Sequence, residues 1–156
     1  MNIFVLDRCP VRAARALCDK HVPKMIVEGA QLLSTAHSEL GSWRVGMYQP
    51  THKNHPCAIW VRSTASNYRW LLMHTLALCY EYTRRYKRTH KTLTVIRQLP
   101  IPPNIPSGEL TPFAQAMPER YKNPDAVAAY RAYYIGDKSR FAVWRHSPTP
   151  DWWPST

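Results

Sequence analysis

Glu28 is the one acidic side chain in a polar stripe that runs along residues 20–35. Polar residues recur there at intervals of three and four, so a helix would place them on one face, which contains His21, Lys24, Glu28, Gln31 and Thr35. A carboxylate beside an imidazole and ammonium groups suits proton transfer, stabilisation of a positively charged sugar, or binding of an anionic ligand across the stripe. An ordinary amphipathic helix also carries such residues on its outer face, so the stripe alone leaves that alternative open.

The chain has 156 residues, 21 Lys and Arg against 10 Asp and Glu, and a formal net charge of +11. This length predicts a single domain, 1–156, and a monomer. The charge indicates a polyanionic partner, and DNA, duplex or single-stranded, is favoured over an anionic membrane. No run of about 18 apolar residues and no signal peptide is recognisable, so we expect no membrane association. The expected location is the cytoplasm of a bacterial or phage-infected cell.

The four cysteines, Cys9, Cys18, Cys57 and Cys79, are widely spaced and contain no C-x-x-C pair. Reduced thiols are therefore the expected state. A metal site could be assembled from Cys18, His21, His52, His55 and Cys57, but their spacing matches no zinc template. We predict no metal and no cofactor.

Residue patterns predict an all-α fold. Residues 1–6 are apolar and are expected to pack against the body. Helical periodicity extends from about Val11 to Leu40, with Pro23 marking either a kink or the start of a second helix that Asp19 would cap. A further helix is expected to begin at Pro56 with Asn54 or His55 as its cap, to bend or restart within 63–67, and to continue from Tyr68 to Tyr86.

The C-terminal third is rich in proline and aromatic residues. Six prolines within 92–118 predict an extended segment that wraps over the helices and is anchored by its apolar side chains. The sequence Asn123-Pro124-Asp125 predicts a helix that ends at Gly136. The tail, 138–156, interleaves aromatic and cationic residues, which suits either contact with nucleic acid or docking on the core.

Cations are concentrated where the predicted long helix ends, at Arg84, Arg85 and Lys87. They exceed what a helix dipole requires, which favours a phosphate-binding role. The segment 51–55 is also dense in hydrogen-bond donors, although capping would explain part of it. The residues that we expect to contact DNA or substrate are Lys20, Lys24, Gln31, His52, Lys53, Asn54, His55, Arg62, Asn67, Tyr68, Arg69, Arg84, Arg85 and Lys87.

The run Asp19-x-His21-Val22, followed by Glu28, resembles the Asp-x-His-aliphatic…Glu run of the bacteriophage pyrimidine-dimer DNA glycosylase (endonuclease V) family. A His-led middle helix, His55 to Lys87, and a C-terminal aromatic cluster, Tyr130 to Lys138, follow in the same order. The resemblance implies a compact all-helical domain that kinks duplex DNA, flips out a nucleotide and cuts its glycosidic bond with the N-terminal amine. It further implies that Glu28 assists this step and that His21 contacts DNA.

Two departures from that family affect the expected chemistry. Val27 and Gln31 stand where the family has arginines, so Lys20, Lys24 or Lys53 would have to replace them, or the lyase step is lost. Asn2 is larger than the residues after which the initiator methionine is usually removed, so we expect the Met1 amine to serve as nucleophile. An α-amine titrates near about 7.7 to 8.0 and is partly neutral at neutral pH.

Three functions are compatible with these observations. The first is a DNA glycosylase with AP lyase activity on damaged or modified pyrimidine nucleotides, with Glu28, His21 and Met1 as catalytic groups. The second is a phage-type enzyme that modifies DNA bases on the same base-flipping scaffold. The third is a basic DNA-binding protein without catalytic activity, for which Glu28 would be incidental.

Overall fold

Helices account for all the regular structure in the computed structural model, which describes residues 1–155. In chain order they are α1 (Pro10–Ala16), α2 (His21–Glu39), α3 (Pro56–Ser63), α4 (Ala65–Tyr86), α5 (Leu93–Gln98), the 3₁₀ helix η1 (Glu119–Tyr121), α6 (Ala126–Tyr133) and the π-helical turn η2 (Tyr134–Lys138). Over this range the chain forms no strand, only an isolated bridge between Val45 and Met47. The prediction of an all-α fold is confirmed.

The first helical region consists of two abutting helices. Pro23 lies in the first turn of α2, where a missing N–H costs no intrahelical bond. The expectation that Asp19 caps α2 is wrong, because Lys20 occupies the cap position and makes no capping bond. The Asp19 carboxylate instead accepts hydrogen bonds from Arg85 Nη1 at 3.0 Å and from the Arg145 backbone N–H at 2.7 Å. Asp19 therefore binds residues that are distant in sequence instead of the first N–H groups of α2.

The middle helices begin as their sequence predicts. Pro56 opens α3, and His55 Nδ1 accepts a hydrogen bond from the Cys57 backbone N–H at 3.1 Å. The helix then breaks at Thr64, whose extended backbone and side-chain cap to the Asn67 N–H start α4. Lys87 ends α4 in the left-handed conformation.

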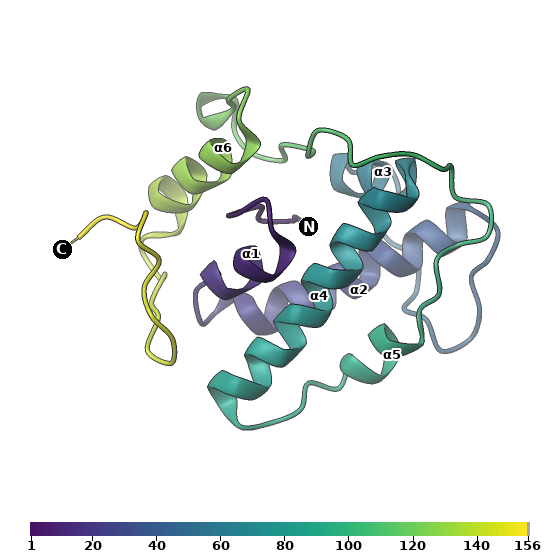
Figure 1. The fold of residues 1–156 in the computed structure, drawn as a ribbon, viewed down its shortest axis with the longest axis horizontal. Coiled ribbons are helices and arrows are strands. Elements are labelled where there is room, and N and C mark those ends of the chain that lie inside the picture. Colours follow the sequence, from purple (N-terminus) through teal and green to yellow (C-terminus); the bar gives the residue numbers. More distant parts are fainter. Residues whose placement is uncertain (156) are drawn as a thin grey trace.

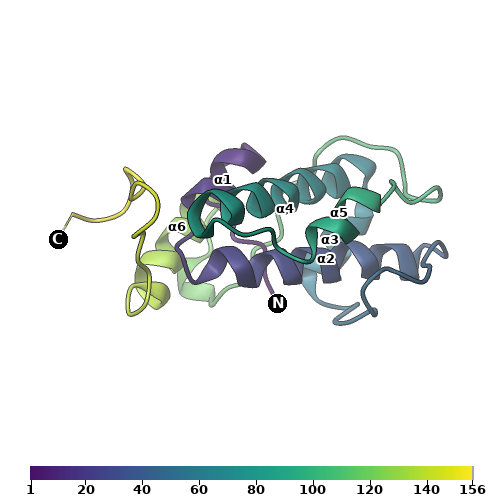
Figure 2. The same ribbon diagram turned by 90° about the horizontal axis from the view of Figure 1, so that it is seen from below.

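Helix α2 packs along α4, and α1 packs on α4 as well. Figure 2 shows α2 and the N-terminus along one side of the domain, with α1, α4 and α5 along the other. Gly29 gives α2 room to pack against α4, because a Cβ there would collide with Thr75 Oγ1. Burying the apolar side chains between them drives this packing. Fully buried members of the core include Leu6, Leu17, Ile26, Leu33 and Leu71.

The proline-rich segment is extended except at its start. Because the chain has no proline from Thr92 to Leu99, it forms the short helix α5 there, which corrects the expectation of a wholly extended 92–118. Residues 99–118 contain no helix and pass around the α3 end of the molecule towards α6 (Figure 1). Ile105 and Phe113 of this part pack against the core.

Helix α6 begins as predicted, with the Asp125 side chain accepting a hydrogen bond from the Val127 N–H. The predicted end at Gly136 is wrong, because the chain continues as η2 to Lys138. Gly136 is needed there for space, since a Cβ would collide with the Tyr121 hydroxyl. In the tail, Trp144, Trp152 and Trp153 surround the buried Tyr134, which favours the docking alternative for 138–156.

Arg85 joins α4 to the junction of α1 and α2. Its guanidinium is 0% exposed and binds Asp19, Glu81 and the backbone carbonyls of Arg15 and Leu17 at 2.8 to 3.0 Å. Burial opposes ionisation of Glu81, but hydrogen bonds from Arg84 and Arg85 outweigh it and lower the Glu81 pKa. This placement corrects the prediction that Arg85 contacts DNA, because the side chain is fully buried and four of its five N–H donors are used within the protein.

We therefore expect the Arg85→Met variant to be strongly destabilised. The substitution leaves Asp19, Glu81 and two carbonyls short of a buried donor, a loss of about 3 to 5 kcal/mol in the free energy of unfolding. Urea denaturation measures this loss. Arg88→Met removes an exposed cation from the same region and should change stability by less than about 0.5 kcal/mol. Equal stability of the two variants would contradict a structural role for Arg85.

Candidate active site

The N-terminal amine lies beside the carboxylate of Glu28. Met1 N is 3.8 Å from Glu28 Oε2, and the Asn2 backbone N–H donates to the same oxygen at 3.0 Å. Glu28 Oε1 lies 3.7 Å from Lys24 Nζ, one helical turn earlier on α2. The carboxylate thus contacts the chain terminus on one side and an ammonium group on the other.

Burial fixes both members of this pair. The Met1 side chain is 4% exposed and that of Glu28 is 14% exposed. Met1 as a whole is only partly buried, so the part that solvent reaches is its backbone, which carries the amine. Residues 3–6 are buried in the core, as predicted, and hold the start of the chain against α2. The backbone of Met1 is therefore partly exposed, while the residues that follow it are packed in the core.

The Asn2 side chain is tied to three separate parts of the chain. Its Nδ2 donates to the Ala116 carbonyl at 2.8 Å, and its Oδ1 accepts from Tyr130 OH at 3.1 Å and from Cys57 Sγ at 3.8 Å. Burial raises the pKa of the Cys57 thiol to about 11 and that of the Tyr130 hydroxyl well above its usual value. Both groups therefore keep the protons that they donate.

The polar segment 51–55 lies along the same side of α2. Thr35 Oγ1 accepts from the Thr51 N–H at 3.0 Å and donates to the Thr51 carbonyl at 3.2 Å, which fixes the segment two turns beyond Glu28. Burial lowers the pKa of His55, the nearby terminal amine and His52 lower it further, and Glu28 partly offsets them. His55 therefore provides a mostly neutral imidazole within the electrostatic reach of the amine.

His21 is buried in an aromatic cluster. It is 4% exposed, its Nδ1 pairs with Tyr134 OH at 2.8 Å, and its ring stacks on Phe4 with centroids 4.7 Å apart. Burial, together with the positive charges of Lys24, Lys138 and Lys20, lowers its pKa to about 3. This placement corrects the expectation of a DNA-contacting His21, because a phosphate cannot reach the ring. The three lysines around it remain exposed or half-buried.

The buried neutral state of His21 makes stability fall in acid. The pKa of an unfolded histidine is near 6.5, and the folded value is about 3, so between these values the unfolded state binds more protons. The stability that the neutral His21 imidazole contributes is fully present above pH 6.5 and is lost as the pH falls towards 3. We expect His21→Gln to reduce this slope by about 1.4 kcal/mol per pH unit in urea denaturation between pH 6 and 4. An unchanged slope would contradict a neutral buried imidazole.

Two other predicted contact residues, Asn67 and Tyr68, are both 0% exposed. Asn67 bonds the Trp60 carbonyl and Thr111, and Tyr68 OH donates to the Pro100 carbonyl. Both hold the extended segment in place, which corrects their assignment to a DNA-binding surface. Local spacing could not reveal this, because Thr111 and Pro100, the partners in the extended segment, lie more than 30 residues away in sequence.

The remaining predicted residues reach the surface in three groups. Around Glu28 lie Lys24 and Gln31, and the segment 51–55 adds the exposed His52, Lys53 and Asn54. Arg62 donates to the Lys53 carbonyl at 2.7 Å, while Lys53 Nζ lies 4.0 Å from Glu39. Arg69 is exposed on α4. Arg84 pairs with Glu81, and Lys87 Nζ donates to the Arg84 carbonyl, at the C-terminal end of that helix.

Sequence reasoning missed Lys138 and Asn2. Lys138 Nζ lies 4.6 Å from the Tyr133 ring centroid and, with Lys20 over Phe141, extends the cationic surface at the start of α2. Its position next to the aromatic run 130–134 was a usable signal. The Asn2 contacts left no such signal, because a lone asparagine near a chain end has no diagnostic spacing.

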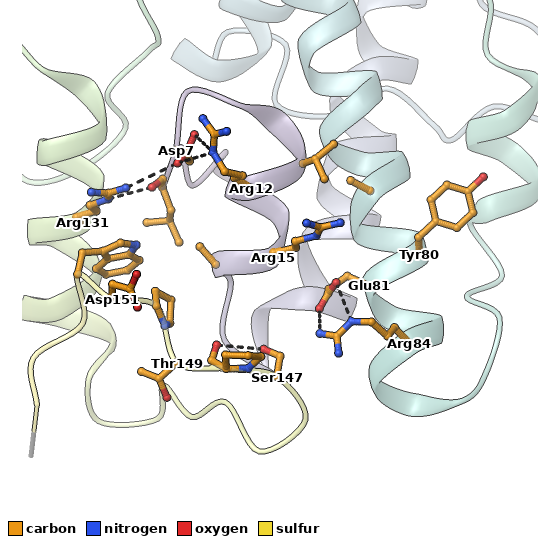
Figure 3. Close-up of a pocket in the computed structure, with 17 residues that line it drawn as sticks. Asp7, Arg12, Arg15, Tyr80, Glu81, Arg84, Arg131, Ser147, Thr149 and Asp151 are labelled. Carbon is orange, nitrogen blue, oxygen red and sulfur yellow. Dashed lines mark hydrogen bonds and ion pairs between the residues drawn. The ribbon is translucent and has the colours of Figure 1, made fainter.

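A groove of about 950 Å³ lies between α1, α4 and residues 147–152 (Figure 3). In that view Arg12 and Arg131 turn towards Asp7, and Arg84 turns towards Glu81. Most of its charges thus neutralise each other. Neither Met1 nor Glu28 lines the groove, which separates it from the amine site.

Within residues 1–155, no three His, Cys, Asp or Glu side chains gather as metal ligands would. Over the same range no helix has the length and apolarity needed to cross a membrane.

The fold and the site together define a small basic helical protein that presents a primary amine beside a carboxylate, an arrangement suited to nucleophilic attack on a polyanionic substrate. The sequence matches the family model described as pyrimidine dimer DNA glycosylase over residues 1–94, and the chain belongs to this family. DNA is thus its substrate class and glycosylase its activity class. No curated protein and no solved structure gives a significant match.

Proposed function

We propose that this DNA glycosylase also has AP lyase activity and that the Met1 α-amine is its nucleophile. The observation that carries the proposal is the 3.8 Å separation between Met1 N and Glu28 Oε2. A primary amine is needed for an imine with a sugar, and a nearby carboxylate can accept its proton and stabilise positive charge at the sugar. The substrate is a damaged or modified pyrimidine nucleotide that is flipped out of the duplex.

In the proposed reaction the amine lone pair attacks C1′ of the deoxyribose. The C1′–N bond breaks, its electron pair leaves with the base, and the base takes up a proton. Glu28 accepts one proton from the attached nitrogen. Protonation of O4′ as the sugar ring opens then gives a protonated imine between Met1 and C1′. The protonated imine makes the C2′ hydrogens acidic. One C2′ proton is lost to water while the C3′–O bond breaks, so the phosphate leaves with the bonding electron pair and the strand is cut. Hydrolysis of the remaining imine then releases the Met1 amine and leaves an unsaturated aldehyde on the DNA end.

The exposed cations around this site would hold the DNA backbone. Lys20, Lys24 and Lys138 surround the start of α2, and the segment 51–55 lies beyond Glu28 on the same helix. Phosphates held on both sides would place the flipped nucleotide over the amine. Arg62, Arg69, Arg84 and Lys87 are proposed as outer contacts only.

Borohydride trapping tests this mechanism. Purified protein is incubated with duplex DNA that carries an abasic site or ultraviolet damage, and borohydride is added to reduce any imine to a stable amine. We expect a covalent adduct whose peptide map places the DNA on Met1. Because Lys24 Nζ also lies within 4 Å of Glu28, an adduct on Lys24 would overturn the assignment of the nucleophile.

The absence of an adduct on every substrate would have a different meaning. If the protein still binds DNA in a salt-sensitive manner, imine chemistry is excluded and the lyase proposal fails. Base release without an imine would then be tested first, by measuring free base after incubation with damaged DNA, and base modification second, by mass analysis of the nucleosides.

A further inference from the structure

The proposed amine nucleophile is held by a side chain that lies next to it in sequence. We infer that Asn2 is a positioning residue for the Met1 amine and that the C-terminal part of the chain supplies its anchor. This inference rests on the proposed function. Two of the Asn2 side-chain partners, the Ala116 carbonyl and Tyr130 OH, lie outside residues 1–94, the part that matches the glycosylase family.

The geometry around Asn2 leaves the first peptide few orientations. Its backbone N–H binds Glu28, its Nδ2 binds Ala116, and its Oδ1 accepts from Tyr130, Cys57 and the Ile3 N–H. Both ends of the side-chain amide are therefore used. A residue bonded in this way fixes the direction in which its own N-terminal neighbour leaves the body of the protein.

Chain termini are usually mobile unless they are tied down. An amine on a mobile terminus would sample many positions, and attack on C1′ requires the nitrogen close to the carbon and in line with the leaving base. The buried Met1 side chain holds one side of the terminal residue, and Asn2 holds the peptide that follows it. The two together keep the amine next to Glu28.

Tyr130, which binds Asn2, is itself hydrogen-bonded to residues 114–116. Tyr130 OH shares its proton between Asn2 Oδ1 and the Ala114 carbonyl, at 3.1 and 2.6 Å, and accepts from the Ala116 N–H at 3.2 Å. The hydroxyl therefore holds residues 114–116 and Asn2 in one network. Removing this hydroxyl should loosen the amine without changing any group that touches DNA.

The test uses Asn2→Leu, which has a similar volume, makes no hydrogen bonds and keeps a large second residue so that Met1 is retained. Intact mass confirms retention. Tyr130→Phe is the second variant. Gln115→Ala is the matched control, because Gln115 lies between Ala114 and Ala116 and its side chain bonds Asn123 instead of Asn2. We expect single-turnover trapping at saturating DNA to slow at least tenfold for Asn2→Leu and about threefold to tenfold for Tyr130→Phe.

The control should trap at the wild-type rate, and DNA affinity should stay within twofold for all three variants. Trapping that is unchanged in Asn2→Leu while the wild type forms its adduct would overturn the positioning role. An equal loss of affinity and trapping rate would also overturn it, because a general loss of folded structure would then explain both. No adduct with the wild type would refute the proposed function itself, so the two failures are distinguishable.

Discussion

Replacing Glu28 by glutamine is expected to reduce turnover on damaged DNA by about 10² to 10³-fold. The amide can still accept the Asn2 N–H bond, so the first peptide keeps its position. It cannot accept the proton of the attacking amine, and it carries no charge to stabilise the developing positive charge at the sugar. The measurement is the single-turnover rate of base release, with borohydride trapping as a second readout.

Binding should respond in the opposite direction to catalysis. Glu28 is an acid within a cationic surface, so the Glu28→Gln variant should bind DNA with equal or slightly higher affinity than the wild type. Glu119→Gln removes the same charge from an exposed side chain on η1 and should leave the turnover rate unchanged. Full turnover in Glu28→Gln would mean that this carboxylate is incidental and that another group handles the proton.

Extending the chain by several residues before Met1 is expected to abolish the adduct, with a loss of at least about a hundredfold. The extension turns the Met1 nitrogen into an amide, whose lone pair is delocalised and cannot form an imine. It also moves the new terminus away from Glu28. The matched control carries the same residues after Thr156, where they leave the Met1 amine free.

Both proteins should bind DNA with similar affinity, because the extension adds no charge if it is built from glycine and serine. A wild-type trapping rate in the extended protein would contradict the role of the Met1 amine. Peptide mapping of that adduct would then decide whether Lys24, the other amine near Glu28, serves as nucleophile.

The parts of this molecule that depend on neighbours in sequence were predictable. The helical polar stripe, the cap at His55 and the restart after Ser63 follow from spacing and from proline and capping chemistry, which act within one or two turns. The prediction that Glu28 belongs to the site came from the same stripe together with the family resemblance, and the structure then places the terminal amine next to it.

The parts that depend on distant partners were not predictable. In the sequence Arg85 is one more cation at a helix end. In the structure it is buried and binds Asp19, 66 residues away, which links α4 to the start of α2. His21 belongs to the polar stripe in sequence, but Phe4 and Tyr134 enclose it. The chain continues in η2 past Gly136, where the absence of a Cβ leaves room for the Tyr121 hydroxyl. In each case a tertiary contact overrides the local pattern.

The network around Asn2 also bears on the order in which the site becomes functional during synthesis. Met1 leaves the ribosome first, whereas the partners of Asn2 at positions 116 and 130 are made more than 100 residues later. The amine proposed as nucleophile exists from the start, but its alignment with Glu28 would be completed only when residues 114–130 have folded back onto Asn2. A chain that lacks residues 114–130 would therefore carry an unaligned amine, so the proposed imine chemistry would require both ends of this network.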